Sequence, residues 1–359
     1  MIAEGNKGLD FLNSIRDGSF KLGLEIGCDL DNHLRFKRGT FNIMAGHANV
    51  GKTKFILYYY LCLSVKHGLK FLIFSSENTV GGIKRDLIQL HAGKEIKAMD
   101  DMTFQYHFEW INEHFKFIDF EEFYRVEKRF MNFRDVFKVA LEDCPYFDAL
   151  VIDPYNSLAE IDEIKGNKHE RDYQVASEFR MFCKQNNKTI YLLAHGNTDA
   201  LRKQYAKGHS FEGHPIPLMA ADIEGGGKWV NRADDFIVIH RLTQHPLEWT
   251  NTEIHVKKVK EIETGGKTTF MDNPVIFRLN SDTVSFTCYQ RGISTIPTNP
   301  LSGEKEKVLQ PTEDEIKKAV NKSQVEQEKK EREYTQLKPV RHWQEKDDDM
   351  FNHVEDWEK

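Results

Sequence analysis

The sequence predicts an α/β fold: a largely parallel central sheet flanked by helices, with an antiparallel extension on its C-terminal side. Between about residues 36 and 290, strand-like runs alternate with helix-like runs. The strand-like runs are almost continuously apolar, as expected of parallel strands covered on both faces. With 359 residues, of which 40% are hydrophobic, the chain is long enough to bury a core of this kind.

The elements follow in order along the chain. The runs predicted as parallel strands are residues 41–45, 70–75, 115–119, 149–153, 189–194 and 236–240. Helix-like segments lie between them, among them 53–65, 134–143 and 172–184. Three later runs are closely spaced, with turn residues at 265–266 and 280–282 between them. Residues 252–261, 274–279 and 285–289 are therefore predicted as the antiparallel extension.

The two ends of the chain are predicted to lie outside a folded domain of residues 21–294. Residues 1–20 form an arm in this prediction, with a short helix at 8–15 that is either a frayed leader or a contact to a neighbouring subunit. From about Ile296, Ser, Pro, Gly, Lys and Glu dominate, which predicts a disordered, charged tail over 295–359. Its Met350, Phe351 and Trp357 lie among acids, as in a solvated tail or in a peptide that docks on another protein.

A glycine-rich turn between the first strand and the first helix carries the most specific motif. Residues 46–53 read GHANVGKT and fit the P-loop pattern G-x-x-x-x-G-K-[ST]. In this pattern backbone N–H groups and the helix N-terminus hold phosphates, the lysine reaches the β- and γ-phosphates, and the hydroxyl binds Mg²⁺. The sequence therefore predicts a nucleoside triphosphate site with Mg²⁺, formed by Gly46, His47, Ala48, Asn49, Val50, Gly51, Lys52 and Thr53.

Polar residues at the ends of three other strands extend this site. Asp153 ends the run ALVID, as a Walker B carboxylate that holds Mg²⁺ does. Glu77 follows the run FLIFSS, where a carboxylate could align the attacking water. His195 ends the run TIYLLAH, where it could touch the γ-phosphate on one side and a DNA-binding loop on the other. The alternative for each is an ordinary polar residue at a strand end.

Three lysines precede the Gly265-Gly266 turn. Lys258 and Lys260 share one face of their strand by alternation, whereas Lys257 points to the other face. Paired cations on one face could clamp the γ-phosphate held by a neighbouring subunit, as an arginine finger does. The alternative is a solvated strand face.

Composition excludes several other classes of protein. No apolar run approaches the ~18 residues that a membrane helix needs, and the first residues lack the pattern of a signal peptide. The 5 cysteines are scattered without a C-x-x-C pair, which indicates neither a zinc site nor a disulfide framework. A cytoplasmic protein is expected. The net charge of −6 means that any nucleic-acid contact must come from local basic patches.

Six runs of residues along the chain resemble the motifs of a known protein family. The runs GHANVGKT, FLIFSSEN, FDALVIDPYNSL, LLAHGN, DIEGGGKWVNRADDFIVIHR and EIHVKKVKEIETGGKT occur in the order found in the RecA-like ATPase domain of DnaB-type hexameric replicative helicases. The chain looks most similar to the Twinkle and bacteriophage primase-helicase branch. The segment 222–241 is the most specific part, and the resemblance covers about residues 20–290.

The resemblance implies roles for single residues. Lys52 and Thr53 match the phosphate and Mg²⁺ ligands, and Asp153 matches the Walker B acid. Glu77 matches the catalytic carboxylate, which the family is expected to carry on the strand next to the P-loop strand, and His195 matches the sensor. Lys258 and Lys260 match the pair that acts on a neighbouring subunit. The second member of that pair is usually arginine, and Gly226-Gly227 replaces the family's Gly-Ser.

The resemblance also implies partners. The long segment 197–227 would face the channel of a hexameric ring and hold single-stranded DNA through Arg202, Lys203, Lys207 and Lys228. Tyr205, Phe211 and Trp229 could stack bases, although packing is favoured for Trp229. An ATP-driven helicase that moves 5′ to 3′ on single-stranded DNA is the leading function. A RecA- or RadA-like recombination filament and a regulatory ATPase without DNA are the alternatives. No primase region precedes the ATPase domain, so a separate primase or other replication protein is expected to bind, with the C-terminal tail as its docking segment.

Overall fold

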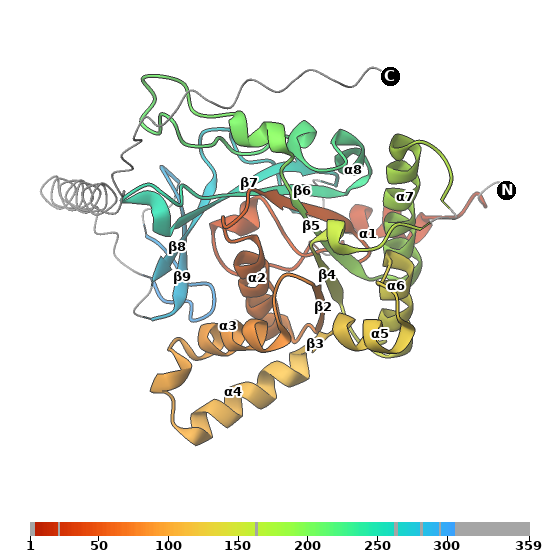
Figure 1. Cartoon of the computed structure of the whole chain (residues 1–359), viewed down its shortest axis with the longest axis horizontal. Helices are drawn as coiled ribbons and strands as arrows, with labels where there is room; N and C mark the ends of the chain where they lie inside the picture. Colours follow the sequence, from red (N-terminus) through yellow and green to blue (C-terminus); the bar gives the residue numbers. More distant parts are fainter. Residues whose placement is uncertain are drawn as a thin grey trace, which may run out of the picture. The chain divides into compact units, whose positions relative to one another are not determined.

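The computed structural model describes residues 4–20, 22–161, 164–261, 265–280, 283–293 and 296–305, which form a sheet with helices on both faces (Figure 1). The 9 strands of the described sheet lie in the order β3-β2-β4-β5-β1-β6-β7-β8-β9. They are β1 (Phe41–Gly46), β2 (Phe71–Ser75), β3 (Phe115–Phe117), β4 (Ala149–Asp153), β5 (Thr189–His195), β6 (Asp235–His240), β7 (Asn251–Val259), β8 (Val275–Asn280) and β9 (Ser285–Gln290). The predicted fold class is confirmed.

The strand pairings show how the two parts of the sheet join. The strands β3, β2, β4, β5, β1 and β6 pair in parallel, and β7, β8 and β9 continue the sheet in antiparallel fashion. Each predicted strand is present within a few residues of its expected bounds. The strand β3 ends two residues earlier than predicted, at Phe117, because the Asp119 side chain instead accepts a hydrogen bond from Glu122 N (3.0 Å) and caps the next helix.

One expectation about the sheet is wrong. The strand that leads to Glu77, β2, is not next to the P-loop strand β1, because β4 and β5 lie between them. The direct neighbours of β1 are β5 and β6. Glu77 therefore reaches the P-loop across the ends of two strands, and His195 at the end of β5 stands between them.

The helices cover the two faces of the sheet. They are α1 (Leu9–Arg16), α2 (Lys52–His67), α3 (Val80–Ala92), α4 (Asp101–His114), α5 (Phe120–Glu127), α6 (Phe133–Glu142), α7 (Lys168–Asn186) and α8 (Gly227–Arg232). Side chains of α2 and α3 share one apolar cluster with one face of the sheet. Side chains of α6, α7 and α8 share a second cluster with the other face. Alternation along β1 explains this division, since Met44 belongs to the first cluster and Phe41 and Ile43 belong to the second.

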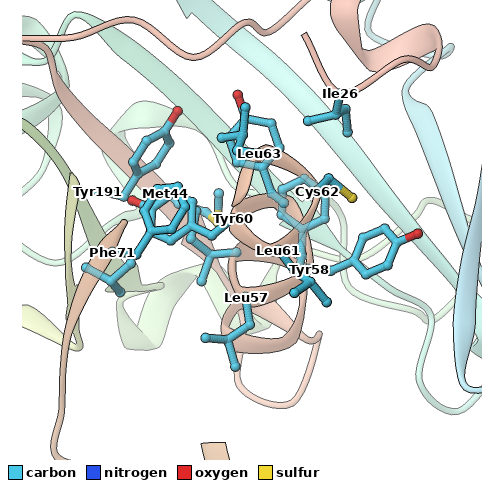
Figure 2. Close-up of a cluster of buried hydrophobic side chains, with 14 of the residues drawn as sticks. Ile26, Met44, Leu57, Tyr58, Tyr60, Leu61, Cys62, Leu63, Phe71 and Tyr191 are labelled. Atoms are coloured by element: carbon cyan, nitrogen blue, oxygen red, sulfur yellow. The ribbon is translucent and has the colours of Figure 1, made fainter. Parts of the chain in front are cut away.

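Helix α2 is the central element of the first layer. Its residues from Phe55 to Ser64 are all buried, so this helix is apolar around its whole circumference rather than amphipathic. Figure 2 shows its side chains against Met44, Phe71 and Tyr191 of the sheet. The Tyr60 ring stacks on Phe71, with ring centroids 3.8 Å apart. Burial on all sides fixes α2, and with it the P-loop at its N-terminus.

The predicted C-terminal boundary at residue 294 does not mark the end of the packed region. Thr298 pairs with Cys288 of β9 through two backbone hydrogen bonds of 2.8 and 3.0 Å. The Asn299 side chain is buried and accepts a hydrogen bond from the Tyr58 hydroxyl (3.1 Å). The polar composition of the chain after Ile296 predicted a disordered tail, so this packing was not expected. Residues 306–359, and with them the predicted docking residues Met350, Phe351 and Trp357, lie outside the described residues.

Candidate nucleotide-binding site

The P-loop connects β1 to α2 by a backbone path that needs small or left-handed residues. A Cβ on Gly46 would lie 2.6 Å from the Ile239 carbonyl oxygen of β6, closer than any real contact, so only glycine fits there. Gly51 has φ 93° and Asn49 has φ 62°, values that side chains other than glycine and asparagine rarely adopt. The turn ends at the N-terminus of α2, where backbone N–H groups have no partner within the helix and favour an anion.

Lys52 lies inside this turn. It is 6% exposed, and its Nζ donates to the carbonyl oxygens of Gly46 (3.1 Å) and His47 (2.9 Å). Burial lowers the pKa of Lys52, and the carboxylates of Asp153 and Glu77 oppose that shift. The ammonium is thus held in the curve of the loop, at the place where the P-loop pattern puts the phosphates.

Thr53 and Asp153 form the part of the site that fits a metal ion. The Thr53 hydroxyl donates to Asp153 Oδ2 at 2.6 Å, although the two residues are far apart in the sequence. Asp153 is 1% exposed and its other oxygen, Oδ1, has no hydrogen-bond partner. Burial raises the pKa of Asp153, and the Glu77 carboxylate adds to this. A buried carboxylate oxygen without a partner beside a hydroxyl is a donor set that suits Mg²⁺.

His195 links Lys52 to Glu77. Its Nδ1 lies 3.3 Å from Lys52 Nζ, and its Nε2 lies 3.1 Å from Glu77 Oε1. Since an ammonium can only donate, Nδ1 accepts from Lys52 and Nε2–H donates to Glu77. The structure therefore brings together the predicted residues Lys52, Thr53, Glu77, Asp153 and His195, which come from four separate segments of the chain.

Four of these five residues, all but Asp153, line an open cleft of about 780 Å³, within the range of about 300–1,000 Å³ that is usual for small-molecule sites. Arg241, for which no role was predicted, also lines this cleft. Its Nη2 donates to the Asn49 carbonyl oxygen (2.7 Å), whereas Nε is buried without a partner. The position of Arg241 directly after β6, at the same edge of the sheet as the P-loop, could have predicted that it contacts the nucleotide cleft.

The segment 197–226 begins and ends at the nucleotide site. Asn197 N donates to Asp222 O (2.7 Å), and Glu224 N donates to the carbonyl oxygen of His195 (3.1 Å). On this segment the Arg202 and Lys207 side chains are exposed. Lys203 differs from expectation, because its ammonium is paired with the buried carboxylate of Asp222. That ion pair closes the base of the segment.

Lys228 and three aromatic side chains are the other residues of this region that were considered as DNA contacts. Lys228 is half-buried near the start of α8. Trp229 is 2% exposed and packs against Phe41 and Tyr155, which confirms the packing interpretation for this side chain. Tyr205 and Phe211 are half-buried, with ring centroids 5.7 Å apart.

Lys258 and Lys260 stand away from the P-loop of their own subunit. Lys258 pairs with Phe236 near the start of β6, whereas the P-loop follows the opposite end of the parallel strands. Its Nζ donates to the carbonyl oxygens of Val230 (2.7 Å) and Ala233 (2.7 Å), at the end of α8. Lys260 is exposed, and its Nζ lies 3.5 Å from Asp234 Oδ1. The prediction that the two lysines share a strand face stays a prediction, because β7 ends at Val259, and Lys258 is engaged by its own subunit.

Two further findings concern the described part of the chain. None of its helices is both long and apolar enough to cross a membrane. Within the same residues there is no group of three or more His, Cys, Asp or Glu side chains that could hold a metal ion. A magnesium ion at Asp153 and Thr53 would therefore need oxygens from a bound phosphate or from water to complete its shell.

Comparison with known proteins defines the class of fold. No protein-family model and no curated protein matches the chain. Among solved structures, an ATPase domain matches with a TM-score of 0.61 at 14% identity, over 80% of this chain and 99% of that one. A DnaB-like replicative helicase, solved with its interactions with primase, matches with a TM-score of 0.58 at 14% identity, over 80% of this chain and 67% of that one.

These matches show that the chain has the RecA-like fold of DnaB-type helicase ATPase domains. The predicted resemblance to that group is confirmed at the level of the fold. The narrower assignment to the Twinkle and bacteriophage primase-helicase branch stays a prediction.

Proposed function

We propose that this protein is an ATP-driven DNA helicase that moves 5′ to 3′ along single-stranded DNA as a hexameric ring. In this proposal ATP is bound by residues 46–53, with Mg²⁺ held by Thr53 and Asp153. Lys52 would neutralise charge on the transferred phosphoryl group. Glu77 would orient the attacking water as general base. A protein of this kind works in the cytoplasm of its cell or host.

The observation that carries the proposal is the covalent and hydrogen-bonded link between His195 and the segment 197–226. One end of His195 contacts Lys52 and Glu77, and its backbone carbonyl accepts a hydrogen bond from Glu224 at the far end of the segment (3.1 Å). A γ-phosphate that displaces Lys52 from His195 would change the position of both ends of the segment. This gives ATP hydrolysis a direct mechanical path to Arg202 and Lys207, which we propose as DNA contacts together with Lys228 and, after release from Asp222, Lys203.

The remaining lysines would complete the site of a neighbouring subunit. Lys260 is exposed and far from its own P-loop, so we propose that it contacts the γ-phosphate bound by the next subunit of the ring. Lys258 would serve in the same pair only if it left the carbonyl oxygens at the end of α8. While it stays there, it fixes the strand from which Lys260 projects. A primase or another replication protein remains the proposed partner of the C-terminal tail.

The direct test combines DNA-stimulated ATP hydrolysis, unwinding and particle shape. We expect single-stranded DNA to stimulate hydrolysis, and a forked duplex with a 5′ tail to be unwound in preference to one with a 3′ tail. Electron micrographs with a non-hydrolysed ATP analogue should show closed rings. Open filaments with strand-exchange activity would instead identify a recombination ATPase, and hydrolysis that ignores DNA would refute the helicase proposal.

Charge variants test the DNA contacts. The double variant Arg202→Ala, Lys207→Ala removes two exposed cations. Each phosphate contact to a single strand contributes about 0.7 to the slope of log K against log salt, so this slope should fall by about 1.4 in magnitude. The variant Lys128→Ala, which removes an exposed cation at the end of α5, is the control and should leave the slope unchanged. An unchanged slope in the double variant would place the DNA elsewhere.

A further inference from the structure

A second cavity of about 340 Å³ is separate from the nucleotide cleft, since the described residues that line the two are all different. Its floor is the outer face of β7, on which Glu253, His255 and Lys257 alternate with Ile254 and Val256. The two apolar residues point the other way, into the core with α2. Three polar side chains on one face of β7 thus line the cavity.

The opposite wall is formed by the segment that we propose to hold DNA. Tyr205, His209 and Phe211 line the cavity, and the Tyr205 ring stacks on His209 with centroids 4.3 Å apart and an interplanar angle of 14°. Arg202 and Lys207 stand on the same segment with exposed side chains. The aromatic wall of the cavity therefore belongs to a segment that also carries exposed cations, a combination found where bases stack and phosphates are neutralised.

One of the polar side chains that line the cavity, Glu253, is an anion. The Glu253 side chain is 15% exposed, and its Oε2 lies 3.1 Å from His255 Nε2. Burial acts to raise the pKa of Glu253, but the hydrogen bond from His255 and the charges of neighbouring groups outweigh it, so the pKa lies below its usual value. Glu253 is thus ionised at neutral pH and can only accept hydrogen bonds.

An ionised carboxylate discriminates between bases. The exocyclic amino group of cytosine donates to a Glu or Asp side chain, whereas thymine presents the O4 acceptor at the same place. Lys257 and Arg291 also line the cavity, with Asp272 at the exposed rim. Cations near the carboxylate suit a ligand that carries a phosphate together with an amino group, and they disfavour a basic peptide.

From this geometry we infer that the cavity is a subsite for one amino-bearing base, cytosine in particular, of the single strand held by segment 197–226. The inference rests on the proposed function, and it adds a base preference to binding that otherwise follows the phosphate backbone. The base would stack against Tyr205 and donate from its amino group to Glu253.

The test compares the affinities of the whole protein for oligo-dC and oligo-dT of equal length, in the presence of a non-hydrolysed ATP analogue. We expect oligo-dC to bind at least about fivefold more tightly, which corresponds to the lower end of discrimination by base contacts. The variant Glu253→Gln, which can donate as well as accept, should bring the ratio close to one. Glu212→Gln is the matched control, because it removes an exposed carboxylate from the same segment outside the cavity, and it should keep the ratio.

A second variant keeps the inference testable if Glu253→Gln does not fold. Tyr205→Ala lies on an outer segment, and it should weaken oligo-dC binding about fivefold or more through loss of stacking. Equal affinities for the two oligomers, or loss of the ratio in Glu212→Gln as well, would overturn the inference while the helicase proposal stands. A raised KM for ATP in Glu253→Gln with an unchanged ratio would assign the cavity to the nucleotide. If neither oligomer binds, the proposed function itself fails.

Discussion

Asp153→Asn is expected to make the protein without nucleotide more stable and to remove its response to Mg²⁺. The carboxylate is 1% exposed, its Oδ1 lacks a partner, and burial raises its pKa, so the folded state disfavours the charge. A buried group without a partner costs about 1–3 kcal/mol. The amide removes the charge but leaves a polar atom without a partner, so we expect the lower end, about 1 kcal/mol.

Thermal unfolding measures this change. A gain of about 1 kcal/mol corresponds to a Tm increase of about 2 °C or slightly less for a domain of this size. The size of this gain depends on pH, because a carboxyl with a raised folded pKa contributes stability below its unfolded pKa and loses it as pH rises through the folded pKa. The difference in Tm between variant and parent should therefore be largest at neutral pH and should shrink toward pH 4, about the unfolded pKa.

The ligand response supplies the second half of the test. At 100 times its Kd, a non-hydrolysed ATP analogue with Mg²⁺ should stabilise the parent by about 2.7 kcal/mol. Asp153→Asn should lose most of the Mg²⁺-dependent part of that increase. Asp148→Asn is the control at the start of β4: Asp148 accepts from Lys70 N (2.8 Å) and pairs with Arg38, so its loss should lower the Tm. A lower Tm for Asp153→Asn, or an intact Mg²⁺ response, would refute the assignment of a metal ligand.

The site and the C-terminal tail lead to four further predictions. Glu77→Gln should retain nucleotide binding, measured by the same Tm increase, and lose hydrolysis by about 10²-fold or more, the scale of a lost general base; hydrolysis near the parent rate would place the base elsewhere. Lys260→Ala subunits mixed with Lys52→Ala subunits should show activity that depends on the mixing ratio in a non-additive way, whereas additive activity would contradict a contact between subunits. Lys260→Arg could raise activity, since it restores the two-pronged geometry of guanidinium. Truncation after Lys305 should leave ring formation and hydrolysis intact and should abolish only the binding of replication partners. A pull-down with the isolated tail measures that binding directly. Aggregation of the truncated protein would show that the tail is structural.

The sequence by itself determined the order and type of the elements of the sheet. Short apolar runs bounded by turn residues are typical of strands covered on both faces, whereas the longer apolar run of α2 forms a buried helix, so the parallel strands and the antiparallel extension could be placed within a few residues. It also determined which residues meet around Lys52, because the carboxyl ends of parallel strands lie at one edge of a sheet and the P-loop occupies that edge. Glu77, Asp153 and His195 were predictable for this reason.

Only the tertiary structure decided what those residues contact. Strand order is not encoded in local periodicity, so β2 was expected beside β1 although two strands separate them. The partners of the long cationic side chains depend on elements remote in sequence. Lys203 meets Asp222, and Lys258 meets the end of α8, neither of which charge patterning could show. The cavity over Glu253 likewise exists only because the segment 197–226 folds back over β7, which places an aromatic wall opposite a half-buried carboxylate.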